Sequence, residues 1–247
     1  YLYGNRQNLG IVRADENAMK FGDRVVKGWE LTAAGYTAVW ATENTREALW
    51  DAMHRKEVYA TSGSRLTVRL FGGWDFKSED AKSRDLADIG YAKGVPMGAD
   101  LPAAPADRAP RFVVSALRDP GTEARPGALL SRLQIVKGWL DREGRTHERV
   151  FDVAGDAKSG ADVDLASCEP RGPGADALCA VWSDPEFDPA ERAVWYARVI
   201  ENPTCRWTTR VCNAGGVRCD DPSQLEEGFG PCCDAQVPKT VQERSWT

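Results

Sequence analysis

The sequence contains very few of the residues that usually carry catalytic chemistry. Only two of its 247 residues are histidines, His54 and His147, and neither has a second histidine or a carboxylate at metal-ligand spacing. We interpret both as solvated surface histidines, and no Ser-His-Asp set can be assembled around them. Neither of the common glycine-rich phosphate loops is present. The chain by itself is therefore not expected to hold a complete active site.

Other absences exclude whole classes of partner. No apolar run approaches the roughly 20 residues that a membrane-spanning helix needs. The net charge is −5 with both signs mixed along the chain, so we expect neither nucleic acid nor an anionic membrane as partner. The chain starts at Tyr1 without Met and stops at Ser245-Trp246-Thr247. We expect a piece of a longer protein, with trimmed tags or ends as the alternative, and a homo-oligomer is left open.

Cysteine is absent from the first 167 residues and crowded into the last third of the chain. The seven cysteines are Cys168, Cys179, Cys205, Cys212, Cys219, Cys232 and Cys233. Their spacing is wrong for a zinc knuckle and no histidine lies near them, so we favour disulfides over free thiols or a metal. An odd number leaves one without a partner in the chain, and the neighbours Cys232 and Cys233 should bridge to different partners. Disulfides indicate a periplasmic or extracellular location.

The N-terminal part predicts a strand followed at once by a helix. Glycines interrupt residues 1–30, which are expected to be loop. A buried strand over 36–41 precedes a helix with Asn44 as its N-cap and Glu47 three residues later. Apolar residues recur at helical spacing over 48–53. A strand that runs into a helix is half of a βαβ unit, which predicts parallel strands upstream of this chain.

The remainder is expected to be β-rich, without further helices. Apolar and β-branched runs predict strands over 66–71, 112–117, 133–140, 148–153 and 194–200. The last run could also be a helix, but its aromatic and β-branched content favours a strand. Residues 77–110 form a long polar stretch. Several short strands joined by long loops indicate a β-sandwich.

One short segment, residues 42–46, offers candidate chemistry. It lies at the C-terminal end of a strand taken as parallel, which is the end where barrel enzymes bind substrate and metal. Glu43 could accept a proton or contact a metal, and Arg46 could hold an anion together with the helix N-terminus. A plain helix cap with a surface ion pair is the simpler interpretation of the same residues.

Two weaker patterns also have simpler interpretations. Trp182, Trp195 and Trp207 could form a platform for stacking sugars, although aromatic residues of a sandwich more often belong to its core. Asp162 and Asp164 alternate as calcium ligands sometimes do, but the other residues of an EF-type loop are missing.

Several longer strings resemble the pattern of one bacterial family, in the same order along the chain. They occupy residues 40–53, 56–63, 94–100, 134–139, 196–199 and 242–247. The family is known as domain of unknown function 3604 (DUF3604), and the resemblance covers about residues 33–247. It is far more specific than any single motif in the sequence.

The resemblance implies an exported protein whose front part is a metal-dependent hydrolase barrel of the polymerase-and-histidinol-phosphatase (PHP) type. Residues 1–63 would then hold the last strand and helix of that barrel, and 64–247 a sandwich-like domain with a cysteine-rich insert. The fold class is α+β, mostly β. Zinc, manganese or a similar divalent metal would be bound by the parent protein and no cofactor by this chain, whose partner would be the remainder of the barrel.

Two functions follow as hypotheses. The first is the mainly structural C-terminal part of a hydrolase that acts on a phosphoester-like substrate, with Glu43 and Arg46 nearest the reaction. The second is a non-catalytic extracellular module that binds glycans or has a structural role. The first predicts clustered His and Asp residues upstream of this chain, and the second does not.

Overall fold

The structure is a computed structural model, and the chain divides into two compact units. It describes residues 19–26, 28–30, 35–105, 108–221, 225 and 228–247. The disulfide unit comprises Tyr1–Ala34, Ala161–Gly172 and Pro203–Gln242. The sandwich unit comprises Gly35–Gly160, Pro173–Asn202 and Glu243–Thr247.

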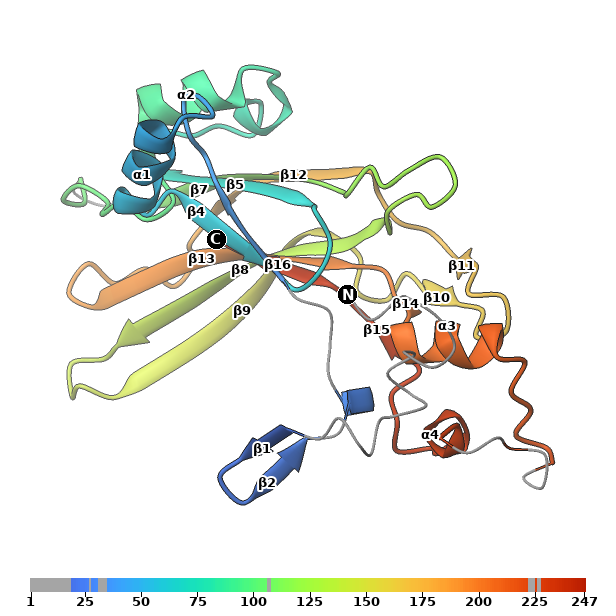
Figure 1. Cartoon of the computed structure of the whole chain (residues 1–247). Coiled ribbons are helices and arrows are strands. Elements are labelled where there is room, and N and C mark those ends of the chain that lie inside the picture. The colour runs from blue at the N-terminus through green and yellow to red at the C-terminus, as the bar shows by residue number, and fades with distance from the viewer. Residues whose placement is uncertain (1–18, 27, 31–34, 106–107, 222–224, 226–227) are drawn as a thin grey trace. The chain divides into compact units, whose positions relative to one another are not determined.

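The sandwich unit is built from two antiparallel sheets (Figure 1). The six-stranded sheet has the order β3-β4-β16-β13-β8-β9, and the four-stranded sheet has the order β12-β7-β5-β6. The strands are β3 Tyr36–Val39, β4 Val58–Thr61, β5 Thr67–Gly73, β6 Gly94–Pro96, β7 Arg111–Leu117, β8 Leu130–Leu140, β9 Thr146–Gly155, β12 Ala177–Ser183, β13 Arg192–Glu201 and β16 Arg244–Trp246. Every pairing in these two sheets is antiparallel. The prediction of a mostly β fold is confirmed.

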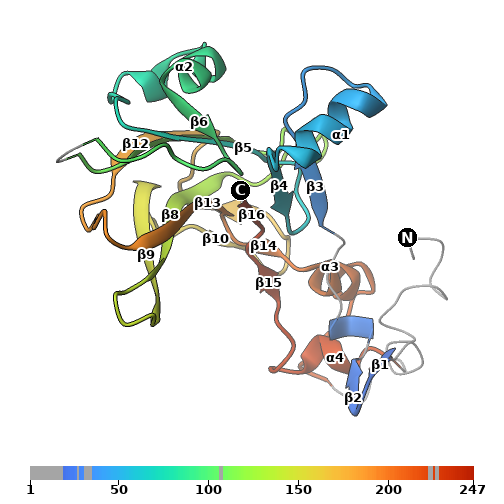
Figure 2. The same ribbon diagram turned by 90° about the vertical axis from the view of Figure 1, so that its left-hand side faces the viewer.

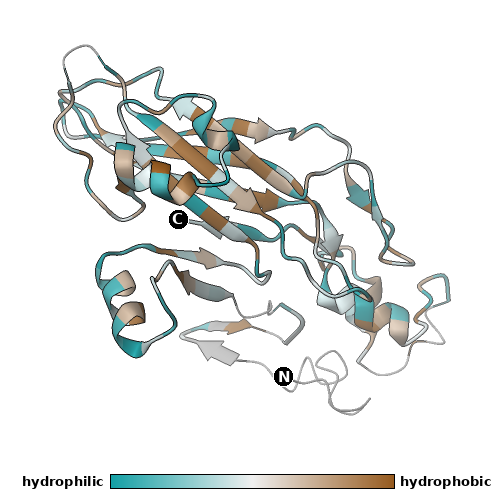
Figure 3. Cartoon of the chain, turned by 90° about the horizontal axis from the view of Figure 1, so that it is seen from above, coloured by the Kyte–Doolittle hydropathy of each residue, from teal (hydrophilic) through white to brown (hydrophobic). Residues whose placement is uncertain are grey.

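The main hydrophobic core of this unit is formed by residues of both sheets. Alternate residues of a strand face the same side, and here Val68 and Leu70 of β5 join Leu133 and Ile135 of β8 and Val199 of β13 in one cluster. None of these five is more than 4% exposed. Figure 3 shows the apolar residues as brown bands along the strands of the sandwich. This alternation is why the long strands were predictable from the sequence.

The predicted strand–helix pair is present, but its strand does not join a parallel sheet. Helix α1 (Arg46–His54) connects β3 to β4 at one edge of the six-stranded sheet, as Figure 2 shows. β3 and β4 are antiparallel, with Tyr36 opposite Thr61 and Val39 opposite Val58. The described residues therefore contain no βαβ unit, because a strand followed by a helix does not fix the direction of the next strand. The expected parallel strands upstream of this chain stay a prediction. The assignment of residues 1–63 to a barrel stays a prediction.

A second helix covers the outer face of the four-stranded sheet. Residues 77–110 form the long polar stretch in which no helix was expected, but they contain a 3-10 turn, η3 (Asp80–Lys82), and helix α2 (Leu86–Lys93). Leu86 and Ile89 of α2 pack against the cluster that contains Phe71 of β5. The close approach requires Gly90, because a Cβ there would lie 2.5 Å from the Phe71 ring. A helix of eight residues with a glycine inside it has little sequence signal.

The disulfide unit has short elements and a small core. Its elements are β1 Met19–Phe21, β2 Arg24–Val26, η2 Gly28–Glu30, β10 Asp162–Val163, β11 Pro170–Arg171, β14 Thr204–Cys205, α3 Trp207–Ala214, α4 Gly230–Cys233 and β15 Thr240–Val241. Val211, Phe229 and Cys232 form the core cluster. Helices α2, α3 and α4 contradict the expectation of no further helix. The hairpin over 19–26 and the 3-10 turn over 28–30 likewise contradict the expected loop there, while residues 1–18 and 27 lie outside the described part.

Candidate functional site

The predicted site residues, Glu43 and Arg46, lie in and just after the turn between β3 and α1. Both are exposed. Thr45 is the N-cap in place of Asn44: its backbone is extended, and its hydroxyl oxygen accepts a hydrogen bond from the Ala48 amide over 3.3 Å. The same hydroxyl donates to Glu43 Oε1 at 3.2 Å. The helix thus begins one residue later than expected, and the catalytic roles of Glu43 and Arg46 stay predictions.

A buried carboxylate that the sequence did not reveal lies just before β4. Glu57 is 1% exposed. Its Oε1 accepts hydrogen bonds from Arg69 Nη2 at 3.2 Å and from the Tyr91 hydroxyl, and its Oε2 accepts one from Arg55 Nη2 at 3.3 Å. The Arg69 guanidinium also lies 4.5 Å from the centre of the Trp40 ring. The pKa of Tyr91 is raised above its ordinary value. Burial is the largest cause, and the hydrogen bond to Glu57 is the second.

This network joins four elements of the sandwich unit. Arg55 caps α1, Glu57 leads into β4, Arg69 belongs to β5 and Tyr91 to α2. Both carboxylate oxygens of Glu57 are occupied by donors, so the network supports α1 rather than presenting a free base. One signal was available: Arg69 is the one charged residue of β5, which is otherwise mainly apolar.

Large apolar side chains on β3 and α1 are exposed to solvent. Trp50 is 65% exposed, and Tyr36 and Met53 are each 49% exposed. Trp50 and Met53 are three residues apart and share one side of the helix, which we call the α1 face. Only Ala52 of α1 is fully buried. Among the described strands, β3 pairs with β4 alone and leaves its other edge open.

The histidines are exposed, as predicted. His54 lies in the last turn of α1, and His147 Nε2 is 2.8 Å from Asp141 Oδ2 while its ring stacks on Trp139. The hydrogen bond from His147 is the main reason that the pKa of Asp141 is lowered. In the described part of the chain, no three His, Cys, Asp or Glu side chains come together as a metal site would require. These residues therefore do not fit a metal centre of their own.

Six of the seven cysteines form disulfides within the disulfide unit. The pairs are Cys168–Cys205, Cys212–Cys232 and Cys219–Cys233. Cys232 and Cys233 bridge to different partners, as predicted. Cys179, exposed on β12, is the unpaired seventh cysteine. The preference for disulfides over a metal is confirmed.

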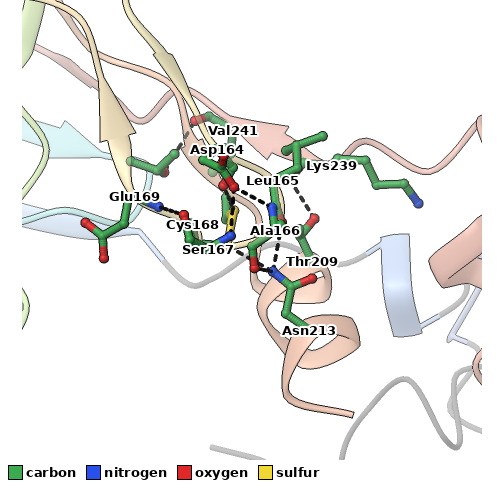
Figure 4. Close-up of a disulfide and its surroundings, with 12 residues drawn as sticks. Asp164, Leu165, Ala166, Ser167, Cys168, Glu169, Thr209, Asn213, Lys239 and Val241 are labelled. Atoms are coloured by element: carbon green, nitrogen blue, oxygen red, sulfur yellow. Dashed lines mark hydrogen bonds between the residues drawn. A yellow bond between two sulfur atoms is a disulfide. The ribbon is translucent and has the colours of Figure 1, made fainter. Parts of the chain in front are cut away.

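The segment before Cys168 is a tight turn closed by Asp164 (Figure 4). The Asp164 carboxylate accepts hydrogen bonds from the amides of Ser167 and Ala166, each at 2.8 Å, and these two bonds lead in lowering its pKa. Asn213 of α3 donates to the Ala166 carbonyl at 2.9 Å and so ties the turn to the helix. The Asp164 carboxylate therefore serves this turn.

The sandwich unit also has a groove of about 410 Å³. Trp74, Phe187 and Trp195 line it, and all three are half-buried. Trp182 and Trp195 pack against the main core, and Trp207 packs against the small core of the disulfide unit. The interpretation of the three tryptophans as core residues is therefore confirmed, although Trp195 also reaches the groove. Sequence patterns missed Trp74 and Phe187 because both lie in loops.

Among the described residues, none of the helices has the length and hydrophobicity needed to cross a bilayer. In comparisons with known proteins, the family model described as "Protein of unknown function (DUF3604)" matches residues 10–247. Neither the curated proteins nor the solved structures give a match.

Proposed function

The chain belongs to the DUF3604 family, and on that premise we propose that it is the β-rich supporting part of an exported metal-dependent hydrolase. In this proposal the same polypeptide carries a PHP-like barrel, which supplies the metal ligands and acts on a phosphoester-like substrate. The sandwich unit stabilises that barrel. Glu43 and Arg46 are the residues of this chain that lie nearest the reaction.

The uncovered surface of β3 and α1 is the observation that carries the proposal. An edge strand exposes unpaired backbone groups, and folded proteins usually cover or protect such an edge. Within the described part of the chain, β3 has one unpaired edge, and the neighbouring α1 face has Trp50 65% exposed. Large exposed apolar side chains that share one side of a helix, as Trp50 and Met53 do, are typical of a contact site. Helix α1 buries little apolar surface, and the Glu57 network holds it in place instead. A docking element must be held in this way before its partner binds.

The three disulfides support export. Disulfides persist in the periplasm and outside the cell and are rare in a reducing cytosol. Among its described residues, the core cluster of the disulfide unit has three buried members, and cross-links add stability to so small a core. A periplasmic or extracellular location is therefore part of the proposal.

The proposal is tested with the complete polypeptide and with this chain alone. Bound metal is determined by elemental analysis, and hydrolysis of bis(p-nitrophenyl) phosphate is followed. We expect metal and activity in the complete polypeptide and neither in residues 1–247. A complete polypeptide without metal and activity would overturn the hydrolase and favour a non-catalytic module.

The role of Glu43 has a separate test in the complete polypeptide. Glu43→Gln should lower activity or metal retention while the unfolding transition stays unchanged. Glu47→Gln, also exposed and four residues further along the chain, is the matched control and should change neither. Unaltered activity and metal content in Glu43→Gln would reduce Glu43 to a neighbour of the helix cap.

A further inference from the structure

The groove of the sandwich unit lies where inward-facing side chains of the two sheets come within reach of solvent. Leu70 and Phe112 of the four-stranded sheet and Trp195 of the six-stranded sheet contribute to its wall. The loop that follows β6 supplies Asp100 and Leu101. A concave site of about 410 Å³ that is lined mainly by apolar residues has the size typical of a small-ligand site.

The aromatic wall is continuous. The ring centres of Trp74 and Phe187 are 6.0 Å apart, those of Phe187 and Trp195 are 6.4 Å apart, and those of Trp195 and Phe112 are 5.2 Å apart. Each ring therefore contacts the next along a row. A ligand in the groove can therefore contact several aromatic rings in succession, among them the half-buried Trp74, Phe187 and Trp195.

A buried ion pair fixes this wall. Asp184 Oδ2 accepts a hydrogen bond from Trp195 Nε1 at 3.1 Å and lies 2.8 Å from Lys137 Nζ. The side chains of Lys137 and Asp184 are 2% and 0% exposed. Lys137 also donates to the Glu186 carbonyl at 2.6 Å, next to Phe187 in the chain. The pair therefore holds both Trp195 and the segment that carries Phe187.

The charged side chains of the groove have one sign. Asp100 and Glu191 are the charged residues among those that line it, and no Lys, Arg or His is present in the lining. Two carboxylates repel an anionic ligand, so this groove does not fit a phosphoester. Carboxylates do accept strong hydrogen bonds from hydroxyl groups.

We propose that this groove binds a neutral oligosaccharide. The C–H faces of its sugar rings, which carry partial positive charge, stack on the negative faces of Trp74, Phe187 and Trp195, and its hydroxyls donate to Asp100 and Glu191. An extended chain of sugars suits a row of rings. The site is independent of the proposed hydrolase, because every residue that forms it belongs to this chain and none needs a metal.

The test uses residues 1–247 in EDTA, so that hydrolase activity has no bearing on the result. Cellohexaose, xylohexaose and mannohexaose are the neutral probes, titrated by calorimetry and by tryptophan fluorescence. A sulfated cello-oligosaccharide and benzyltrimethylammonium are the anionic and cationic controls. We expect at least one neutral hexasaccharide to bind and both charged controls to bind more weakly.

Two variants tie the binding to the groove. Phe187→Ala and Glu191→Gln should each raise the Kd about tenfold, through a lost stacking face and a weakened hydrogen bond. Leu140→Ala and Glu148→Gln, at exposed positions outside the groove, are the matched controls and should leave the Kd unchanged. Circular dichroism verifies that each variant is folded. If Phe187→Ala unfolds, Glu191→Gln still tests the groove, because glutamine has nearly the same size as glutamate.

Three results would overturn the proposal. One is the absence of binding by all three neutral hexasaccharides. Another is preferential binding of the sulfated oligosaccharide or of benzyltrimethylammonium. The third is a neutral hexasaccharide that binds equally well to the wild type and to folded Glu191→Gln and Phe187→Ala.

Discussion

Replacing Glu201 by glutamine is expected to stabilise the sandwich unit at pH 8 but not at pH 4.5. Glu201 ends β13 and is 2% exposed. Burial raises its pKa to about 7, a hydrogen bond with Ser64 acts in the opposite direction, and the charges of Glu243 and Asp119 raise the pKa further. The folded protein therefore carries a carboxyl group that resists ionisation in the neutral range.

The expected gain follows from proton linkage. The rise in pKa from 4.5 to about 7 corresponds to about 3 kcal/mol, at ~1.4 kcal/mol for each pH unit. Between these two values the folded state binds more protons than the unfolded state, so the free energy of unfolding falls as the pH rises from 4.5 to 7. Glutamine does not ionise. The advantage of Glu201→Gln should grow from about zero at pH 4.5 to about 3 kcal/mol at pH 8.

The assay is urea unfolding with the disulfides intact, followed by tryptophan fluorescence at several pH values between 4.5 and 8. Glu148→Gln, an exposed glutamate on β9, is the control and should shift the midpoint little at any pH. The reasoning is refuted if Glu201→Gln is no more stable than the wild type at pH 8, or if its advantage is equally large at pH 4.5.

Three further predictions concern single contacts. Lys137→Met leaves Asp184 buried without its cation and should lower the free energy of unfolding by roughly 3–5 kcal/mol, measured in urea; a loss under ~1 kcal/mol would contradict the buried ion pair. Thr45→Ala should cost about 1 kcal/mol through the lost N-cap, whereas Asn44→Ala should be nearly neutral, and thermal melts showing the reverse order would restore Asn44 as the cap. In denaturant, iodoacetamide should label one thiol, Cys179, before reduction and seven after it, counted by intact mass.

Much of the sandwich could be predicted because alternation is a local property of a strand. The run at 194–200 was ambiguous between helix and strand, and β13 covers Arg192–Glu201 because its aromatic and β-branched residues fit a pleated surface. The direction of β3 could not be predicted in this way. It depends on β4, whose other neighbour is β16 from the end of the chain. Pairing between strands that are far apart in the sequence produces no periodic pattern of residues from which it could be predicted.

The candidate sites show the same difference between local features, which could be predicted, and long-range contacts, which could not. The turn that carries Glu43 could be located because a strand, a cap and a helix follow one another in sequence. Glu57 and its donors come from separate elements, and their contacts depend on how α2 lies on β5. The groove likewise joins Trp74 and Phe187 from two loops, so neither residue stood out before the sheets were assembled.

The most direct test of the supporting role is amide hydrogen exchange, measured by mass spectrometry in the complete polypeptide and in residues 1–247 alone. If β3 and α1 dock against a barrel, their amides over 36–39 and 46–54 should exchange more slowly in the complete polypeptide, while those of the β8–β9 hairpin should be unchanged. Equal exchange of β3 and α1 in the two samples would contradict the docking, and with it the proposal that this chain supports a catalytic part.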